Sequence, residues 1–152
     1  MDLLPNSSGC FVCGRDNPIG LKLRFTATAD GVEGQLTPGP SYQGFGSVLH
    51  GGVVAALLDD ALWYAIYRST GAATMTAELT LRYKKSVPCG EPITVRGRLL
   101  ENRRGRLFTA HGSIYDAAGA LLAEATGSFL AAPPELAQRL VREFGATPPA
   151  GP

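Results

Sequence analysis

A histidine and two glycines, His50-Gly51-Gly52, stand immediately before a long apolar run. Backbone N–H groups at the start of a helix have no intrahelical acceptor, and glycine lets a ligand approach them closely. Together with the helix dipole, these donors favour negative charge. They could therefore stabilise the oxyanion that forms when an acyl carbonyl is attacked. A plain glycine-rich joint between a loop and a helix is the alternative interpretation.

Asp59 follows Gly52 by seven residues, which is close to two helical turns, so the two share one stripe of the expected helix. Aspartate is unfavourable inside a helix, and burying its charge is costly unless the charge has a partner. The next residue, Asp60, is rotated by about 100° onto an apolar stripe, which disfavours two carboxylates acting in one site. Asp59 is thus the candidate general base or nucleophile. Acids on a solvent face or at a subunit contact are the alternatives.

Other catalytic groups have little support. No GxSxG is present, and Cys89 lies in a Pro-Cys-Gly turn. Cys10 and Cys13 form a single CxxC, but a zinc site needs about four ligands. Beyond this pair the chain offers only Cys89, His50 and His111, without a second paired motif. We therefore predict reduced thiols in a loop, with no metal and no other cofactor.

The composition predicts one soluble, cytoplasmic domain. The 152 residues carry 14 basic and 13 acidic side chains, so no large field of one sign is available to attract nucleic acid or an anionic membrane. The first residues lack the pattern of a signal peptide, and no apolar run approaches the roughly 20 residues of a membrane span. An odd number of cysteines fits a reducing compartment.

The hydrophobic periodicity predicts the elements that must position these residues. Residues 21–29 and 32–37 alternate as two strands that turn at Asp30-Gly31. Residues 53–70 are apolar almost all round, which is typical of a buried helix. Four more alternating segments follow, at residues 75–83, 93–100, 107–115 and 121–130. This order predicts an α+β domain in which an antiparallel sheet of about six strands curls around one long helix.

Three regions are expected along the chain. Residues 1–20 form an N-terminal loop segment with the CxxC, and residues 21–132 form the domain of sheet and helix. Residues 133–152 form a tail, in which Leu136, Leu140, Val141 and Phe144 have the spacing of a short amphipathic helix. The proline-rich end of this tail is expected to be disordered.

The segment from Leu49 to Asp59, LHGGVVAALLD, resembles the HGG(x)₆D signature of the PaaI-like acyl-CoA thioesterases of the hotdog fold, within the 4-hydroxybenzoyl-CoA thioesterase superfamily. The resemblance extends over roughly residues 10–130, and it includes CFVCG at residues 10–14, NPIGL at residues 17–21 and Gln43-Gly44. It implies a curved antiparallel sheet wrapped around one long central helix. It also implies a homodimer with active sites at the subunit interface, with further pairing to tetramers in some members.

The resemblance implies hydrolysis of an acyl-CoA or aryl-CoA thioester. Asp59 would be the catalytic carboxylate, and the N–H of Gly51, together with that of Gly52, would polarise the thioester carbonyl. His50 would orient the loop or the substrate, and Thr76 matches a Ser/Thr position that can hold the attacking water. In such proteins the acid and the glycine donor that face one thioester come from different subunits.

Substrate contacts are expected from three groups of residues. Gln43 stands where relatives use an amide near the carbonyl, and Asp60 stands where many relatives have Glu. The acyl group is expected in an apolar slot beside the helix near Leu58, Leu62 or Trp63. The phosphates of CoA need a local basic patch, for which the available side chains are Arg82, Lys84, Lys85, Arg103, Arg104 and Arg106. Solvated strand ends and a turn are the alternative interpretation of these six.

Two other functions are compatible with the same fold. A non-catalytic protein that binds acyl-CoA would keep the fold and lose the acid or the donors, yet both are present here. An enoyl-thioester hydratase typically pairs an Asp with a His a few residues later, and no His follows Asp59 at that spacing.

Overall fold

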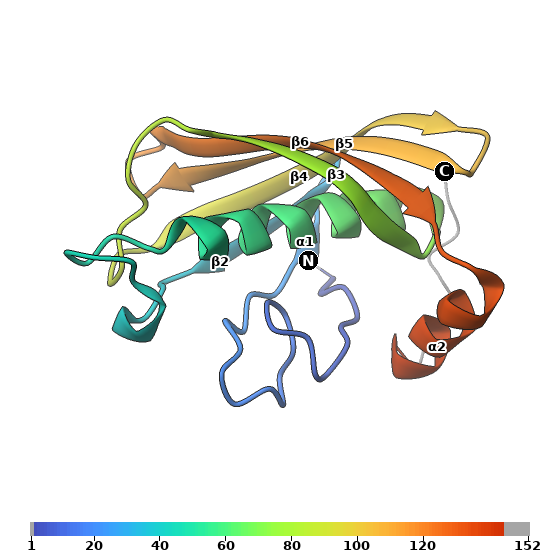
Figure 1. Ribbon diagram of the computed structural model, residues 1–152, viewed down its shortest axis with the longest axis horizontal. Coiled ribbons are helices and arrows are strands. Elements are labelled where there is room, and N and C mark those ends of the chain that lie inside the picture. Colours follow the sequence, from blue (N-terminus) through green and yellow to red (C-terminus); the bar gives the residue numbers. More distant parts are fainter. Residues whose placement is uncertain (1, 145–152) are drawn as a thin grey trace.

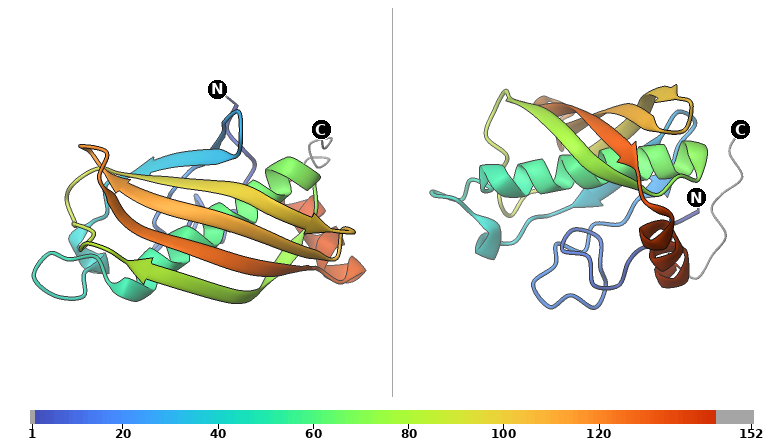
Figure 2. Two further views of the ribbon diagram at one scale, coloured as in Figure 1. Left: turned by 90° about the horizontal axis from the view of Figure 1, so that it is seen from above. Right: turned by 45° about the vertical axis from the view of Figure 1, so that its right-hand side comes forward.

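The computed structural model describes residues 2–144 and contains one antiparallel sheet with two α-helices. The elements are β1 (Thr26–Ala27), β2 (Val32–Leu36), the 3₁₀ turn η1 (Pro40–Tyr42), α1 (Gly51–Thr70), β3 (Thr74–Tyr83), β4 (Ile93–Arg103), β5 (Leu107–Asp116), β6 (Leu121–Ala131) and α2 (Pro134–Phe144). The six strands lie in the order β1-β2-β4-β5-β6-β3. The sheet curves around α1 (Figures 1 and 2), so the expected α+β hotdog fold is confirmed.

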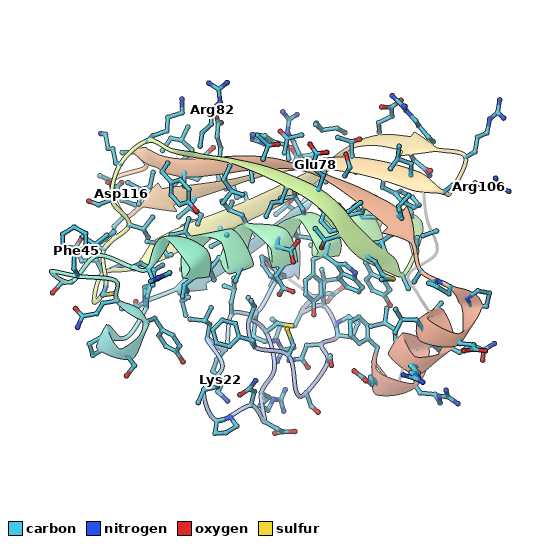
Figure 3. All side chains as sticks on the ribbon, viewed as in Figure 1. Lys22, Phe45, Glu78, Arg82, Arg106 and Asp116 are labelled. Carbon is cyan, nitrogen blue, oxygen red and sulfur yellow. The ribbon has the colours of Figure 1, made fainter. Side chains whose placement is uncertain are left out.

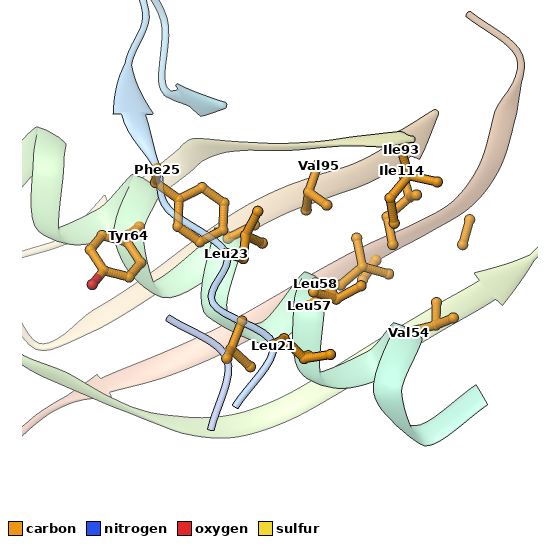
Figure 4. Packing of buried hydrophobic residues seen from close by; sticks show 14 of the residues in the cluster. Leu21, Leu23, Phe25, Val54, Leu57, Leu58, Tyr64, Ile93, Val95 and Ile114 are labelled. Carbon is orange, nitrogen blue, oxygen red and sulfur yellow. The ribbon is translucent and has the colours of Figure 1, made fainter. Parts of the chain in front are cut away.

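The central helix α1 lies between the sheet and the N-terminal segment, residues 2–25 (Figure 1). One core cluster joins Leu23 and Phe25 of this segment to Leu57 and Tyr64 of the helix and to Val95 of β4 (Figure 4). Because apolar neighbours lie on two opposite sides of the helix, its sequence is apolar almost all round.

A row of glycines lets α1 approach the sheet closely. Gly97 of β4 pairs with Gly112 of β5, and a Cβ on Gly97 would lie 2.2 Å from the carbonyl oxygen of Ala61. On Gly112 and on Gly127 of β6, a Cβ would lie 2.4 and 2.8 Å from the Leu62 side chain. Only glycine permits these contacts. The row therefore lets α1 lie close to the sheet, with Ala61 and Leu62 on the side that faces it.

The predicted first strand is wrong over most of its length. Only Thr26–Ala27 pair with β2. Before them, the N–H groups of Leu21 and Leu23 donate to the carbonyls of Phe11 and Val12. The alternation thus identified the buried side chains correctly. The backbone hydrogen-bond partners of Leu21 and Leu23, however, are Phe11 and Val12 of the same N-terminal segment and not a strand of the sheet.

The other predicted elements occur within a few residues of their expected bounds. The amphipathic helix of the tail is present as α2, and the predicted disorder of the proline-rich end concerns residues 145–152, which lie outside the described part of the chain. Within residues 2–144, no helix combines the length and the apolar character that crossing a membrane requires.

Replacing Gly97 by Ala is expected to lower the free energy of unfolding by about 1–3 kcal/mol, because the new methyl group would meet the helix backbone, which cannot move aside alone. Gly39→Ala is the matched control, since Gly39 has a φ of −76° and no atom within 4 Å of an added Cβ. It should change stability by less than about 0.5 kcal/mol. Urea unfolding measures both, and equal stabilities would contradict the close contact between helix and sheet.

Candidate active site

His50 caps the start of α1. Its Nδ1 accepts a hydrogen bond from the Gly52 N–H at 2.9 Å, and its carbonyl accepts from the N–H groups of Val53 and Val54. The bond to Nδ1 requires a neutral imidazole with its proton on Nε2. Because the cap satisfies a donor of the first turn, the helix begins at Gly51, two residues before the start predicted from periodicity.

Gly51 has the free donor of the glycine pair. The N–H of Gly52 is engaged by His50, whereas no acceptor lies within hydrogen-bond distance of the Gly51 N–H among residues 2–144. The hydroxyl of Tyr83 donates to the Gly51 carbonyl at 2.8 Å, a contact that no sequence signal indicated. Of the two predicted donors, only Gly51 is therefore available to a ligand in this structure.

An open pocket of about 610 Å³, the helix-start pocket, adjoins Gly51. Its lining includes Phe45, His50, Lys84 and Lys85. The phenyl group of Phe45 is 80% exposed and lies at one end of the molecule (Figure 3). The pocket therefore combines a free N–H donor, two lysines and an exposed aromatic ring.

Gln43 belongs to the loop that leads into α1. Its Oε1 accepts a hydrogen bond from the Ser47 N–H at 3.2 Å, and the neighbouring Tyr42 carbonyl accepts from the His50 N–H at 3.0 Å. Within one chain, the Gln43 side chain thus shapes the loop and does not line the helix-start pocket.

Asp59 and Thr76, both predicted from the sequence, lie in contact. The Asp59 carboxylate on α1 accepts a hydrogen bond from the Thr76 hydroxyl on β3 at 2.7 Å. Burial raises the pKa of the Asp59 carboxyl, and the hydrogen bond from Thr76 partly opposes this rise. A carboxylate that is fixed in position and more basic than usual suits general-base chemistry.

Asp59 and the free donor are too far apart to serve one carbonyl within one chain. Eight residues separate Asp59 from Gly51, which is about 12 Å along a helix axis. A thioester carbonyl that contacts the Gly51 N–H therefore lies beyond reach of the Asp59 carboxylate of the same chain.

Asp60 faces the N-terminal segment. Its Oδ1 lies 4.0 Å from the Cys10 sulfur, and its Oδ2 is buried without a hydrogen-bond partner among the residues that the structure describes. The pKa of the Asp60 carboxyl is raised well above its usual range. Burial is the largest cause of this rise in pKa, and the charge of Cys10 is the next. A hydrogen bond with Cys13 lowers the pKa of Cys10 to about 6. Two thiols of the N-terminal segment, in place of the apolar stripe expected from the sequence, therefore lie beside Asp60.

A second open pocket, the α1–α2 pocket, has a volume of about 380 Å³ and includes Asp59 and Asp60. Its apolar wall consists of Trp63, Leu136, Leu140 and Phe144. The Trp63 ring stacks on that of Tyr67 with 5.3 Å between centroids, and it meets Phe144 edge-on at 5.7 Å. This aromatic group connects α2 to α1 beside the Asp59 carboxylate.

The acyl slot was expected near Leu58, Leu62 or Trp63, and the structure places these three side chains differently. Trp63 lines the α1–α2 pocket, but Leu58 and Leu62 have 0% exposure. Both leucines pack onto the sheet at Gly112. In the single chain these two leucines are therefore not exposed to a ligand, because they pack against the glycine row, and the acyl slot stays a prediction that Trp63 alone of the three can serve.

The six basic candidates do not form one patch in a single chain. Lys84 and Lys85 line the helix-start pocket, while Arg82 projects from the face of the sheet that points away from α1 (Figure 3). Arg103 is the last residue of β4, and Arg104 and Arg106 lie in the turn that follows it. Figure 3 shows Arg106 at the opposite end of the sheet. Arg103 is paired there with Glu101 at 2.9 Å.

Residues 46–123 match the family model of the thioesterase superfamily. This match spans more than half of the 152 residues and includes His50, Gly51, Asp59 and Thr76. The chain belongs to the thioesterase superfamily. The resemblance carried by the HGG(x)₆D segment is thereby confirmed at the level of this superfamily.

Similar proteins agree with this family membership. The chain is 34% identical to acyl-coenzyme A thioesterase THEM4 of Bos taurus over 97 residues, which are 64% of this chain and 39% of that protein. It thus spans about two fifths of the length of this relative. The crystal structure of a thioesterase superfamily protein superposes with a TM-score of 0.72 at 33% identity, covering 81% of this chain and 60% of that one. A Bacillus halodurans protein solved with CoA superposes with a TM-score of 0.66 at 25% identity, covering 74% and 76%.

Proposed function

We propose that this chain hydrolyses acyl-CoA or aryl-CoA thioesters to the free acid and CoA, with Asp59 as the catalytic carboxylate. The observation that carries the proposal is the hydrogen bond from Thr76 to Asp59, next to the α1–α2 pocket with its apolar wall. Membership of the thioesterase superfamily supports the reaction class. The CoA-bound Bacillus halodurans relative supports a CoA thioester as the ligand.

In this mechanism Asp59 accepts a proton from water while the water oxygen attacks the thioester carbonyl carbon. Thr76 holds one oxygen of the carboxylate, which leaves the other for the water. The tetrahedral intermediate then collapses, the C–S bond breaks, and its electron pair leaves with the CoA sulfur as a thiolate. Direct attack by Asp59, which forms an anhydride that water later hydrolyses, is the second route open to the same carboxylate.

A second copy of the chain would complete the site. β3 is an edge strand that pairs with β6 alone in the described sheet, and Thr76 lies on it next to Asp59. A ten-residue edge with unpaired backbone groups is suited to pairing with another chain. The exposed apolar side chains of Met75 and Tyr83 lie on the same strand. Antiparallel pairing about a two-fold axis would bring the helix start of one subunit toward Asp59 of the other.

The two pockets fit the two parts of the substrate. The α1–α2 pocket, with Trp63 and Phe144 in its wall, would take the acyl or aryl group. The helix-start pocket of the second subunit would take the CoA part, with Lys84 and Lys85 near its phosphates. Its Gly51 N–H would then donate to the oxyanion.

Asp59→Asn is expected to lower kcat for CoA release roughly 10²- to 10⁴-fold, because the amide cannot accept the proton of water. The assay follows free thiol from a panel of acyl-CoAs and aryl-CoAs. Asp30→Asn makes the same chemical change in the β1–β2 turn, at the opposite edge of the sheet, and should retain the wild-type rate.

A wild-type rate in Asp59→Asn would show that Asp59 is not the catalytic group. Stabilisation of the wild type by CoA, without turnover of any substrate in the panel, would contradict hydrolysis and favour a CoA-binding protein.

Gly51→Pro is expected to lower kcat about 10²- to 10³-fold, since proline removes the N–H that stabilises the oxyanion. Proline fits the first helical position, His50 has the extended backbone that a following proline requires, and a Cβ on Gly51 would approach no atom closer than 3.7 Å. Gly51→Ala keeps the N–H and should retain most of the activity. Equal rates in the two variants, at equal melting temperatures, would exclude this donor.

A further inference from the structure

The N-terminal segment places two sulfurs and a carboxylate together on the side of α1 that faces away from the sheet. One ligand atom from each of Cys10, Cys13 and Asp60 lies within 4.8 Å of the other two. The three residues also line the α1–α2 pocket. They are separate from the Asp59–Thr76 pair, and thioester hydrolysis gives them no role.

The backbone around Cys10 is arranged to support a thiolate. The N–H groups of Val12 and Cys13 both point at the Cys10 sulfur, at 3.4 and 3.5 Å. The Gly14 N–H bonds back to the Cys10 carbonyl at 3.0 Å. A Cβ on Gly14 would lie 2.4 Å from that carbonyl oxygen, so this tight turn requires glycine. Such a turn presents both sulfurs of a CxxC on one side.

The carboxylate of Asp60 is the second, independent observation. Its Oδ2 has no accessible surface and no hydrogen-bond partner among the described residues. A buried polar oxygen without a partner is costly, and in native structures such an atom calls for an ion or a water. A disulfide between Cys10 and Cys13 would leave this oxygen unpartnered, whereas a cation would satisfy all three groups.

We propose that Cys10, Cys13 and Asp60 form a zinc(II) site that joins the N-terminal segment to α1. Zn–S bonds of about 2.3 Å and Zn–O bonds of about 2.1 Å in a tetrahedron place the ligand atoms about 3.6–3.8 Å apart. One oxygen of the Asp60 carboxylate lies within 4.8 Å of both sulfurs, and Oδ1 is 4.0 Å from the Cys10 sulfur. A small rotation of the carboxylate therefore brings Oδ2, the oxygen without a partner, to that spacing.

The chemistry of the ligands selects the metal. Two thiolates favour zinc over magnesium and calcium, which prefer oxygen ligands, and a carboxylate is an ordinary third ligand of zinc. Water can reach the fourth position because the three residues line the open pocket. The Tyr64 hydroxyl lies 3.3 Å from the Cys13 sulfur and donates to the Pro5 carbonyl at 2.8 Å. Tyr64 therefore contacts both a proposed zinc ligand and the backbone of the N-terminal segment, and such contacts orient the ligands of a metal site.

Cobalt(II) substitution tests this site without any assay of thioester hydrolysis. The full chain, reduced and stripped of metal with a chelator, is titrated with Co²⁺ in the absence of oxygen. We expect a thiolate-to-cobalt charge-transfer band that saturates at one equivalent per chain and disappears when Zn²⁺ is added. Zinc at about 100 times its Kd should raise the melting temperature by roughly 5–10 °C.

Variants locate the ion. Cys10→Ser and Cys13→Ser should abolish the band at the wild-type saturating concentration, and Asp60→Asn should weaken the affinity for Co²⁺ at least about 10-fold. Cys89→Ser is the matched control, because Cys89 lies outside the cluster, and it should keep the band. The proposal is overturned if the reduced wild type shows neither the band nor the shift with zinc. It is equally overturned if the band survives in the Cys10→Ser, Cys13→Ser double variant or is lost in Cys89→Ser.

Discussion

The close contact between α1 and the glycine row of the sheet determines where every candidate functional group lies. With Gly97 against the Ala61 carbonyl and Gly112 against Leu62, the helix presents one stripe to the sheet at close range. The stripe that faces the sheet is therefore apolar and completely buried. The candidate functional groups of α1 therefore lie at the helix start and on its two remaining sides, where a side chain can contact β3, α2 or the N-terminal segment.

This orientation of the helix separates two neighbouring acids. Asp59 points to β3 and meets the Thr76 hydroxyl, whereas Asp60, about 100° further round the helix, meets the Cys10 sulfur. Each carboxylate has a raised pKa because of burial, but their surroundings suit different chemistry. An acid beside an apolar pocket can accept a proton from water, and an acid beside two thiols can share a cation with them.

Periodicity predicted the order of elements and an antiparallel sheet that curls around one helix, because it depends on neighbours along the chain. The family resemblance implied the hotdog fold and singled out Asp59 and Thr76, but the hydrogen bond between these two residues was not predicted. Local patterns failed where a partner is distant in sequence. Residues 21–25 alternate like a strand, but their hydrogen-bond partner is a loop. The helical stripe and the comparison with relatives that have Glu there gave no sign that Asp60 lies beside Cys10, fifty residues away, because this contact depends on how the N-terminal segment folds back over α1.

We propose that the acid and the oxyanion donor of one site come from the two subunits of a homodimer, and mixed dimers test this proposal most directly. Subunits with Asp59→Asn are combined with subunits that carry Gly51→Pro, after each homodimer is shown to lack CoA release. In a mixed dimer one of the two sites would retain both an intact Asp59 and an intact Gly51 N–H, so activity should return. If both groups served one site within a single chain, every site would keep one defect, and the mixture would remain inactive.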